Sequence, residues 1–117
     1  KYTIDSYDIN AFTRTLFDML DRRICNLSPD VKREFKKLYI AYKLDINFVD
    51  IVVQKQRLRI SLNMKFSEIH DPKGLCKDIT GLGRWGNGDV EVFFEHTSEI
   101  DDVMELIEQS YSKQADE

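Results

Sequence analysis

Residues 57–64 carry the pattern that most restricts what this chain can fold into. Leu58, Ile60, Leu62 and Met64 alternate strictly with polar residues. A period of two places alternate side chains on opposite faces of a β-strand, so one face is buried and the other faces water. The pattern predicts a sheet that is covered on one side only.

Three further segments alternate in the same way, namely residues 35–44, 48–54 and 90–94. The first three predicted strands follow one another closely, with turns expected at 45–47 and 54–56. Such short links favour antiparallel pairing.

Two segments have helical spacing. Residues 9–27 should be capped by Ser6 or Asp8 and bury one stripe: Ile9, Phe12, Leu16, Leu20, Ile24 and Leu27. A second helix should begin near Ser98 and bury Ile100, Val103, Met104, Ile107 and Tyr111. Residues 67–79 suggest a short helix.

These elements predict one α+β domain over residues 1–117. We expect a four-stranded, mainly antiparallel sheet with two amphipathic helices packed on one face, in the order α-β-β-β-α-β-α. A chain of 117 residues fits one domain, and residues 113–117 should fray. Because the chain begins with Lys1 rather than Met, we expect it to be cut from a longer protein.

The net charge of −4 conceals an uneven distribution. Residues 32–84 hold 12 basic and 6 acidic side chains, whereas residues 85–117 hold 1 basic and 10 acidic. This asymmetry favours either two electrostatically different faces or neutralisation of one segment by the other across the fold.

Cys25 and Cys76 are far apart and match no Cys-x-x-Cys motif, so we expect free thiols and a cytoplasmic location. No run of about 18 apolar residues predicts a membrane-spanning helix.

Basic residues in the middle of the chain form two groups. Lys55, Arg57 and Arg59 fall on or beside one strand face, and Lys32, Arg33, Lys36 and Lys37 form the second group. On a wet face they could hold phosphates. The alternative is a solvated face, or one that pairs with the acidic last helix. Tyr39 and Tyr42 lie on opposite strand faces, so at most one could stack on a base.

The glycine-rich segment Gly81–Asp89 contains G-x-G-x-x-G, but a strand rather than a helix follows it. It is therefore predicted either as a tight connection that Trp85 pins to the sheet, or as a rim that presents Arg84 and Trp85 to a ligand. His70 and His96 lie in unlike segments and predict no metal site. Glu91 and Glu95 share the outer strand face without a sign of a catalytic cleft. We expect no catalytic residue, metal or cofactor.

Several short motifs look familiar. They are Lys37–Lys43 with Asn47 and Phe48, Gln54-Lys55, Leu58, Leu62-Asn63, Asp71–Gly74 and Trp85–Val90. Together they resemble a bacterial and archaeal family, domain of unknown function 5655, some members of which are labelled predicted transport protein. The resemblance extends to Tyr111. Its signature positions are Lys37, Tyr39, Tyr42, Lys43, Lys55, Trp85, Gly86, Asn87, Gly88 and Asp89.

The resemblance implies a domain that occurs alone or as the C-terminal domain of a longer protein, where it tends to follow nuclease-like or restriction-type modules. It implies no catalytic residues, and Arg84 stands where many members have His. The label of a transport protein finds no support in a chain without a predicted membrane segment.

The leading hypothesis is a non-catalytic accessory domain that helps a nuclease-like partner to engage nucleic acid. The alternatives are a small-ligand or enzymatic domain using Gly81–Asp89, and an interaction or oligomerisation module using the sheet edge. The candidate binding residues are Lys37, Tyr39, Lys43, Lys55, Arg57, Arg59, Arg84, Trp85, Asn87 and Asp89.

Overall fold

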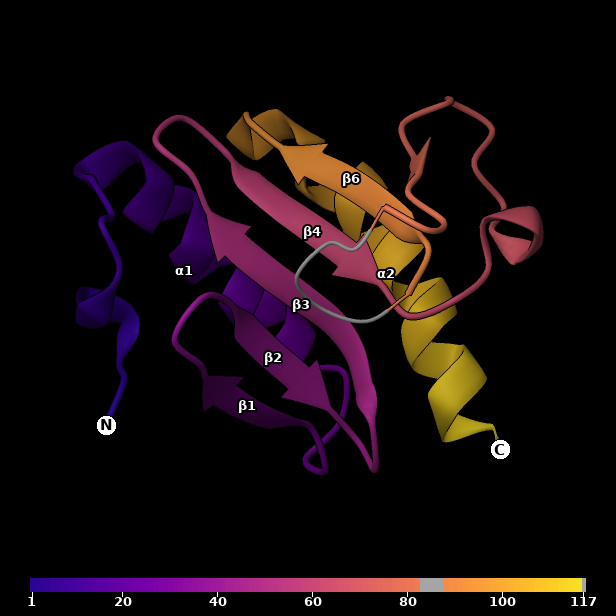
Figure 1. Ribbon diagram of the computed structural model, residues 1–117, viewed down its shortest axis with the longest axis horizontal. Helices are drawn as coiled ribbons and strands as arrows, with labels where there is room; N and C mark the ends of the chain where they lie inside the picture. The colour runs from indigo at the N-terminus through magenta and orange to yellow at the C-terminus, as the bar shows by residue number, and fades with distance from the viewer. Residues whose placement is uncertain (83–87, 117) are drawn as a thin grey trace.

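The computed structural model describes residues 1–82 and 88–116 and has two layers (Figure 1). One is an antiparallel sheet, and the other consists of helices α1 (Ala11–Cys25) and α2 (Ile100–Ala115), which both cover the same face of that sheet. The strands are β1 (Lys32–Phe35), β2 (Ile40–Lys43), β3 (Asn47–Val53), β4 (Leu58–Leu62), β5 (Lys77–Asp78) and β6 (Val90–Phe94). Short 3₁₀ turns occupy Ile4–Ser6, Phe66–Glu68 and Thr97–Glu99.

The predicted α+β class, the antiparallel pairing and the two covering helices are confirmed, but the number of strands is not. The described residues form a sheet of six strands, in the order β1-β2-β3-β4-β6-β5, rather than four. The predicted strand at 35–44 is two strands, because a turn closed by the Lys36 amide and the Tyr39 carbonyl (2.9 Å) interrupts it. β5 pairs only Lys77 and Asp78 with β6, which is too short a run to produce a readable period.

The helix ends also differ from the expected ones. Asn10, and not Ser6 or Asp8, caps α1, since its side chain accepts a hydrogen bond from the Thr13 amide at 2.9 Å. The turn Thr97–Glu99 precedes α2, so Ser98 does not cap it. Residues 67–79 form the end of one 3₁₀ turn and strand β5 instead of a short helix.

The core lies between the helices and the sheet. Leu16, Leu20 and Ile24 of α1 and Met104 and Ile107 of α2 are fully or almost fully buried there. β4 contributes Leu58, Ile60 and Leu62, as its alternation predicts. The buried Ser110 hydroxyl donates to the Phe48 carbonyl (2.6 Å), which ties α2 to β3.

The face of the sheet away from the helices carries polar residues at its centre, but these are buried. Asp50, Ser61 and Glu91 are direct cross-strand neighbours on β3, β4 and β6, and their exposed fractions are 1%, 2% and 1%. The expectation of a water-exposed face is therefore wrong at its centre. We call this side the open face because no helix covers it.

Candidate functional site

Four of the candidate binding residues meet at one end of the sheet. Lys37 and Tyr39 belong to the turn between β1 and β2, and Lys55 and Arg57 belong to the turn between β3 and β4. Antiparallel registry places both turns at the same end, close to the start of α1 (Figure 1). We call this part of the molecule the turn end.

Hydrogen bonds from the N-terminal segment hold the turn end in place. The Tyr7 hydroxyl donates to the carbonyls of Lys36 (2.6 Å) and Tyr39 (3.1 Å). The Asn10 side-chain amide donates to the Lys55 carbonyl at 2.7 Å. The two turns are thus fixed to the segment that leads into α1, although they are distant from it in sequence.

Arg57 and Arg59 do not form the exposed cationic stripe that the alternation predicts. The Arg59 side chain is only 13% exposed, and its Nε lies 3.7 Å from the Glu91 carboxylate. Arg57 is partly buried, lies over the Phe93 ring at 3.7 Å and donates from Nε to the Gln54 side chain at 2.7 Å. Arg59 is therefore a largely buried structural cation, while Arg57 is a partly exposed residue without an ion pair among the described residues.

The remaining candidate residues lie apart from the turn end. Lys43 pairs with Glu34 at 3.2 Å on β1. Asp89 lies at the opposite end of the sheet, where its carbonyl accepts from the Ile79 amide at 2.9 Å. Arg84, Trp85 and Asn87 lie outside the described residues, and with them most of the glycine-rich segment.

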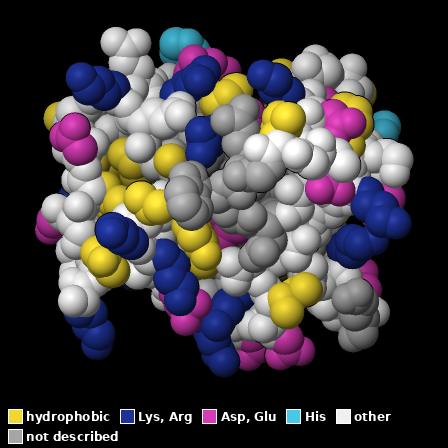
Figure 2. All heavy atoms as spheres, viewed as in Figure 1, with side chains coloured by type: hydrophobic (Ala, Val, Ile, Leu, Met, Phe, Trp, Pro, Cys, Tyr) yellow, Lys and Arg dark blue, Asp and Glu magenta, His cyan; other side chains and the backbone are white. Residues whose placement is uncertain are grey.

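Lysine and arginine side chains are spread over the open face, with acidic groups among them (Figure 2). Several cations of the basic middle segment are neutralised: Arg33 by Asp21, Lys36 and Lys43 by Glu34, Arg59 by Glu91 and Lys73 by Asp102. Lys37, Lys55 and Arg57 form no ion pair with another described residue. The basic segment is therefore neutralised by the acidic segment in part, through Arg59 and Lys73.

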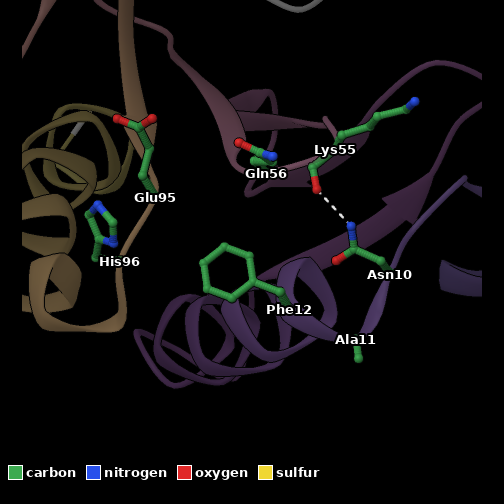
Figure 3. Close-up of a pocket in the computed structure, with 7 residues that line it drawn as sticks. All are labelled: Asn10, Ala11, Phe12, Lys55, Gln56, Glu95 and His96. Carbon is green, nitrogen blue, oxygen red and sulfur yellow. Dashed lines mark hydrogen bonds between the residues drawn. The ribbon is translucent and has the colours of Figure 1, made fainter.

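A surface hollow of about 610 Å³ lies beside the turn end. Its lining comes from the start of α1, the β3–β4 turn and the end of β6, and consists of Asn10, Ala11, Phe12, Lys55, Gln56, Glu95 and His96. Figure 3 shows the Phe12 ring in the middle of these residues, with Gln56 close by and the Lys55 side chain extending away from the ring.

Phe12 is the residue of this hollow that the sequence misplaces. Its helical spacing predicts burial with Leu16 and Leu20, but 47% of Phe12 is exposed. It occupies the second position of α1, one turn before Leu16, the first buried hydrophobic residue of that helix. No single-sequence signal distinguishes such a residue, because its period is the same as that of its buried neighbours.

Tyr42, another signature position, is structural. It is fully buried, and its hydroxyl donates to the Asp21 carboxylate at 2.8 Å. Burial, and then the nearby Asp21 carboxylate, raise the pKa of Tyr42 well above its ordinary value. The phenol therefore stays protonated and works as a hydrogen-bond donor between β2 and α1.

The structure contains neither a metal cluster nor a membrane helix in the part of the chain that it describes. No group of three or more His, Cys, Asp or Glu residues within 1–82 and 88–116 could hold a metal ion. No helix in these ranges is long and apolar enough to cross a membrane.

Comparison with known proteins places the chain in a family. The model of DUF5655, described as a domain of unknown function, matches residues 5–114. The chain belongs to this family. The resemblance read from the tryptophan-glycine motif and the lysine-rich strand is thereby confirmed.

One curated relative of this DUF5655 domain is an uncharacterized protein of Haemophilus influenzae. It is 40% identical over 103 residues, which cover 88% of this chain but 34% of the relative. The chain thus spans about a third of the relative's length, so in that protein the domain is one part of a longer chain. No solved structure matches the chain significantly.

Proposed function

We propose that this domain is a non-catalytic binding domain that contacts the phosphate backbone of nucleic acid through Lys37, Lys55 and Arg57 at the turn end. The observation that carries the proposal is that these three cations gather at one end of the sheet without an ion pair among the described residues. Unpaired Lys and Arg side chains bind phosphates and release the counterions condensed on them.

The position of the acidic residues supports the same surface. α2 lies on the covered face of the sheet and carries four of the ten acidic side chains of residues 85–117, namely Asp101, Asp102, Glu105 and Glu108. Two of these acids are neutralised there, Asp101 by Arg23 and Asp102 by Lys73. The turns that hold Lys37 and Lys55 are fixed instead to the segment that leads into α1, and neither lysine pairs with an acid of α2.

A role beside a partner domain agrees with the length of the relative. The matched region is a third of the Haemophilus influenzae protein, and the remainder could hold an activity that this domain assists. We propose that the partner is a nuclease- or restriction-type domain, for which a contact to phosphates supplies affinity without sequence preference. The two free cysteines fit a cytoplasmic protein.

Two charge variants of equal net charge test the proposal. Lys37→Ala with Lys55→Ala removes two turn-end cations. Lys65→Ala with Lys77→Ala removes two exposed lysines toward the opposite end of the sheet, which pair with no acid within residues 1–82 and 88–116. Fluorescence anisotropy with a labelled oligonucleotide at low salt should show about tenfold weaker binding by the first variant only. Equal losses in both variants, or no binding by the wild-type domain, would contradict a localised phosphate site.

A further inference from the structure

The strongest feature that the proposed phosphate contact leaves unexplained is the hollow beside Lys55. It combines a half-exposed aromatic ring, Phe12, with hydrogen-bonding side chains on both sides. We propose that this hollow holds one unpaired base of a single-stranded nucleic acid, stacked on the Phe12 ring. This inference rests on the proposed function, since Lys55 would bind the adjoining phosphate.

The chemistry of the lining fits a base better than a phosphate. Glu95 is exposed and forms no ion pair among the described residues, so its carboxylate would repel a phosphate inside the hollow. The same carboxylate can accept a hydrogen bond from the amino group of cytosine. Gln56 adds an amide donor and acceptor on another side of the ring.

The phosphate next to the stacked base would bind at the rim of the hollow. The Lys55 side chain extends away from the Phe12 ring toward solvent, so its ammonium group lies outside the space that the base would fill (Figure 3). A bound nucleotide would therefore place its base on the Phe12 ring inside the hollow and its phosphate beside the Lys55 ammonium group outside it. This is the combination that proteins use for single strands, because every base presents a π-face and every phosphate a charge.

Hydrogen bonds hold the walls of the hollow before any ligand arrives. The Asn10 amide donates to the Lys55 carbonyl at 2.7 Å and thereby joins the helix start to the β3–β4 turn. The Gln54 backbone N–H donates to the Arg57 backbone carbonyl at 3.0 Å and closes that turn. The backbone N–H groups of Glu95 and His96 both donate to the Glu99 carboxylate at 2.8 Å. A site ordered in advance loses less conformational entropy on binding.

A base in a duplex could not enter this hollow, because its faces and its pairing edge are already occupied by neighbouring bases. The proposal therefore predicts a preference for single strands that depends on Phe12. Phosphate contacts alone would give no such preference, since they are common to both forms.

The test compares Phe12→Ala with Phe66→Ala, which removes another exposed phenylalanine, at the opposite end of the sheet (36% exposed). The probes are a single strand of cytosines, the same strand with abasic positions, and a duplex. Phe12→Ala should weaken binding of the cytosine strand by about 5- to 100-fold and leave duplex binding unchanged. Phe66→Ala should change neither, and Phe12→Trp should restore single-strand affinity.

The outcomes separate this inference from the proposed function. If the wild-type domain binds strands and duplex alike, and Phe12→Ala alters neither, the base site is wrong while the phosphate surface stands. If the abasic strand binds as tightly as the cytosine strand, the base site is also wrong and the phosphate surface stands. If the wild-type domain binds no nucleic acid, both proposals fail. Unchanged melting temperature of Phe12→Ala will show that the variant is folded.

Discussion

The Tyr42 hydroxyl of β2 donates a 2.8 Å hydrogen bond to the Asp21 carboxylate of α1. Arg33 of β1 reaches the same carboxylate at 2.9 Å. One acidic side chain therefore joins two strands to the helix that covers them. Tyr42, which the resemblance marks as a signature position, thus stabilises the fold.

Removing that hydroxyl should destabilise the domain. Tyr42 is fully buried and its acceptor is charged, so Tyr42→Phe should lower the free energy of unfolding by about 2 kcal/mol. The matched control is Tyr111→Phe, since the Tyr111 hydroxyl makes no hydrogen bond to another described residue. Urea unfolding of both variants gives the comparison. If both variants lose the same free energy of unfolding, the hydrogen bond to Asp21 does not stabilise the fold.

Gly88 should tolerate substitution less well than the other described glycines. Its φ is +101°, and an added Cβ would collide with the Leu62 carbonyl and the Asn63 backbone. Gly74 and Gly81 also have positive φ but open space around them. Gly88→Ala should therefore cost about 3 kcal/mol or more, and Gly74→Ala and Gly81→Ala about 1 kcal/mol each. Similar thermal shifts for the three variants would contradict the close backbone approach.

The stability of the domain should fall as the pH rises above 9. Burial, and then the Asp71 carboxylate, raise the pKa of the Cys76 thiol from 9.0 to about 12. Between these values the unfolded chain loses this proton while the folded chain retains it, so unfolding becomes easier with rising pH. Below pH 9 the thiol is protonated in both states and the contribution is complete.

Cys76→Ala isolates that contribution from other groups that ionise in the same range. The melting temperature of the wild-type domain should fall more steeply than that of the variant between pH 9 and pH 12. Each protein is compared with its own value at pH 8, which removes the direct packing effect of the substitution. Parallel curves would mean that the thiol ionises equally easily in both states.

Arg59 should matter for stability more than Arg57 does. The Arg59 guanidinium faces Glu91 in a region with little access to water, so Arg59→Ala should cost about 3 kcal/mol. Arg57→Ala loses a cation–π contact and a partly buried hydrogen bond between neutral Gln54 and the guanidinium, which together contribute about 1 kcal/mol. Chemical denaturation of both variants measures the two losses of unfolding free energy. A larger loss for Arg57→Ala would contradict the assignment of Arg59 as structural.

Side-chain periodicity predicts the elements of this fold well wherever one residue in two or one in three to four is buried. β4 is the clearest case, since Leu58, Ile60 and Leu62 are all buried as expected. The same signal cannot reveal the turn at Lys36–Tyr39, because the alternation continues across it. Nor can it reveal β5, which has only two residues.

The candidate site depends on contacts between segments that are distant in the chain, and a single sequence does not reveal these contacts. Arg57 and Arg59 look equivalent in the strand pattern, yet only Arg59 lies beside the buried Glu91 carboxylate. The difference depends on which strand lies next to β4. That neighbour is β6, which begins 28 residues after the end of β4. Phe12 likewise follows the helical period but is half-exposed, beside a turn from a distant segment.

The salt dependence of oligonucleotide binding tests the phosphate surface most directly. If Lys37, Lys55 and Arg57 each contact one phosphate, a plot of log affinity against log salt concentration for a single strand should have a slope of about −2. Lys55→Ala should reduce the magnitude of that slope by about 0.7. Affinity that does not change with salt, or an unchanged slope in Lys55→Ala, would contradict the assignment of these cations to nucleic acid.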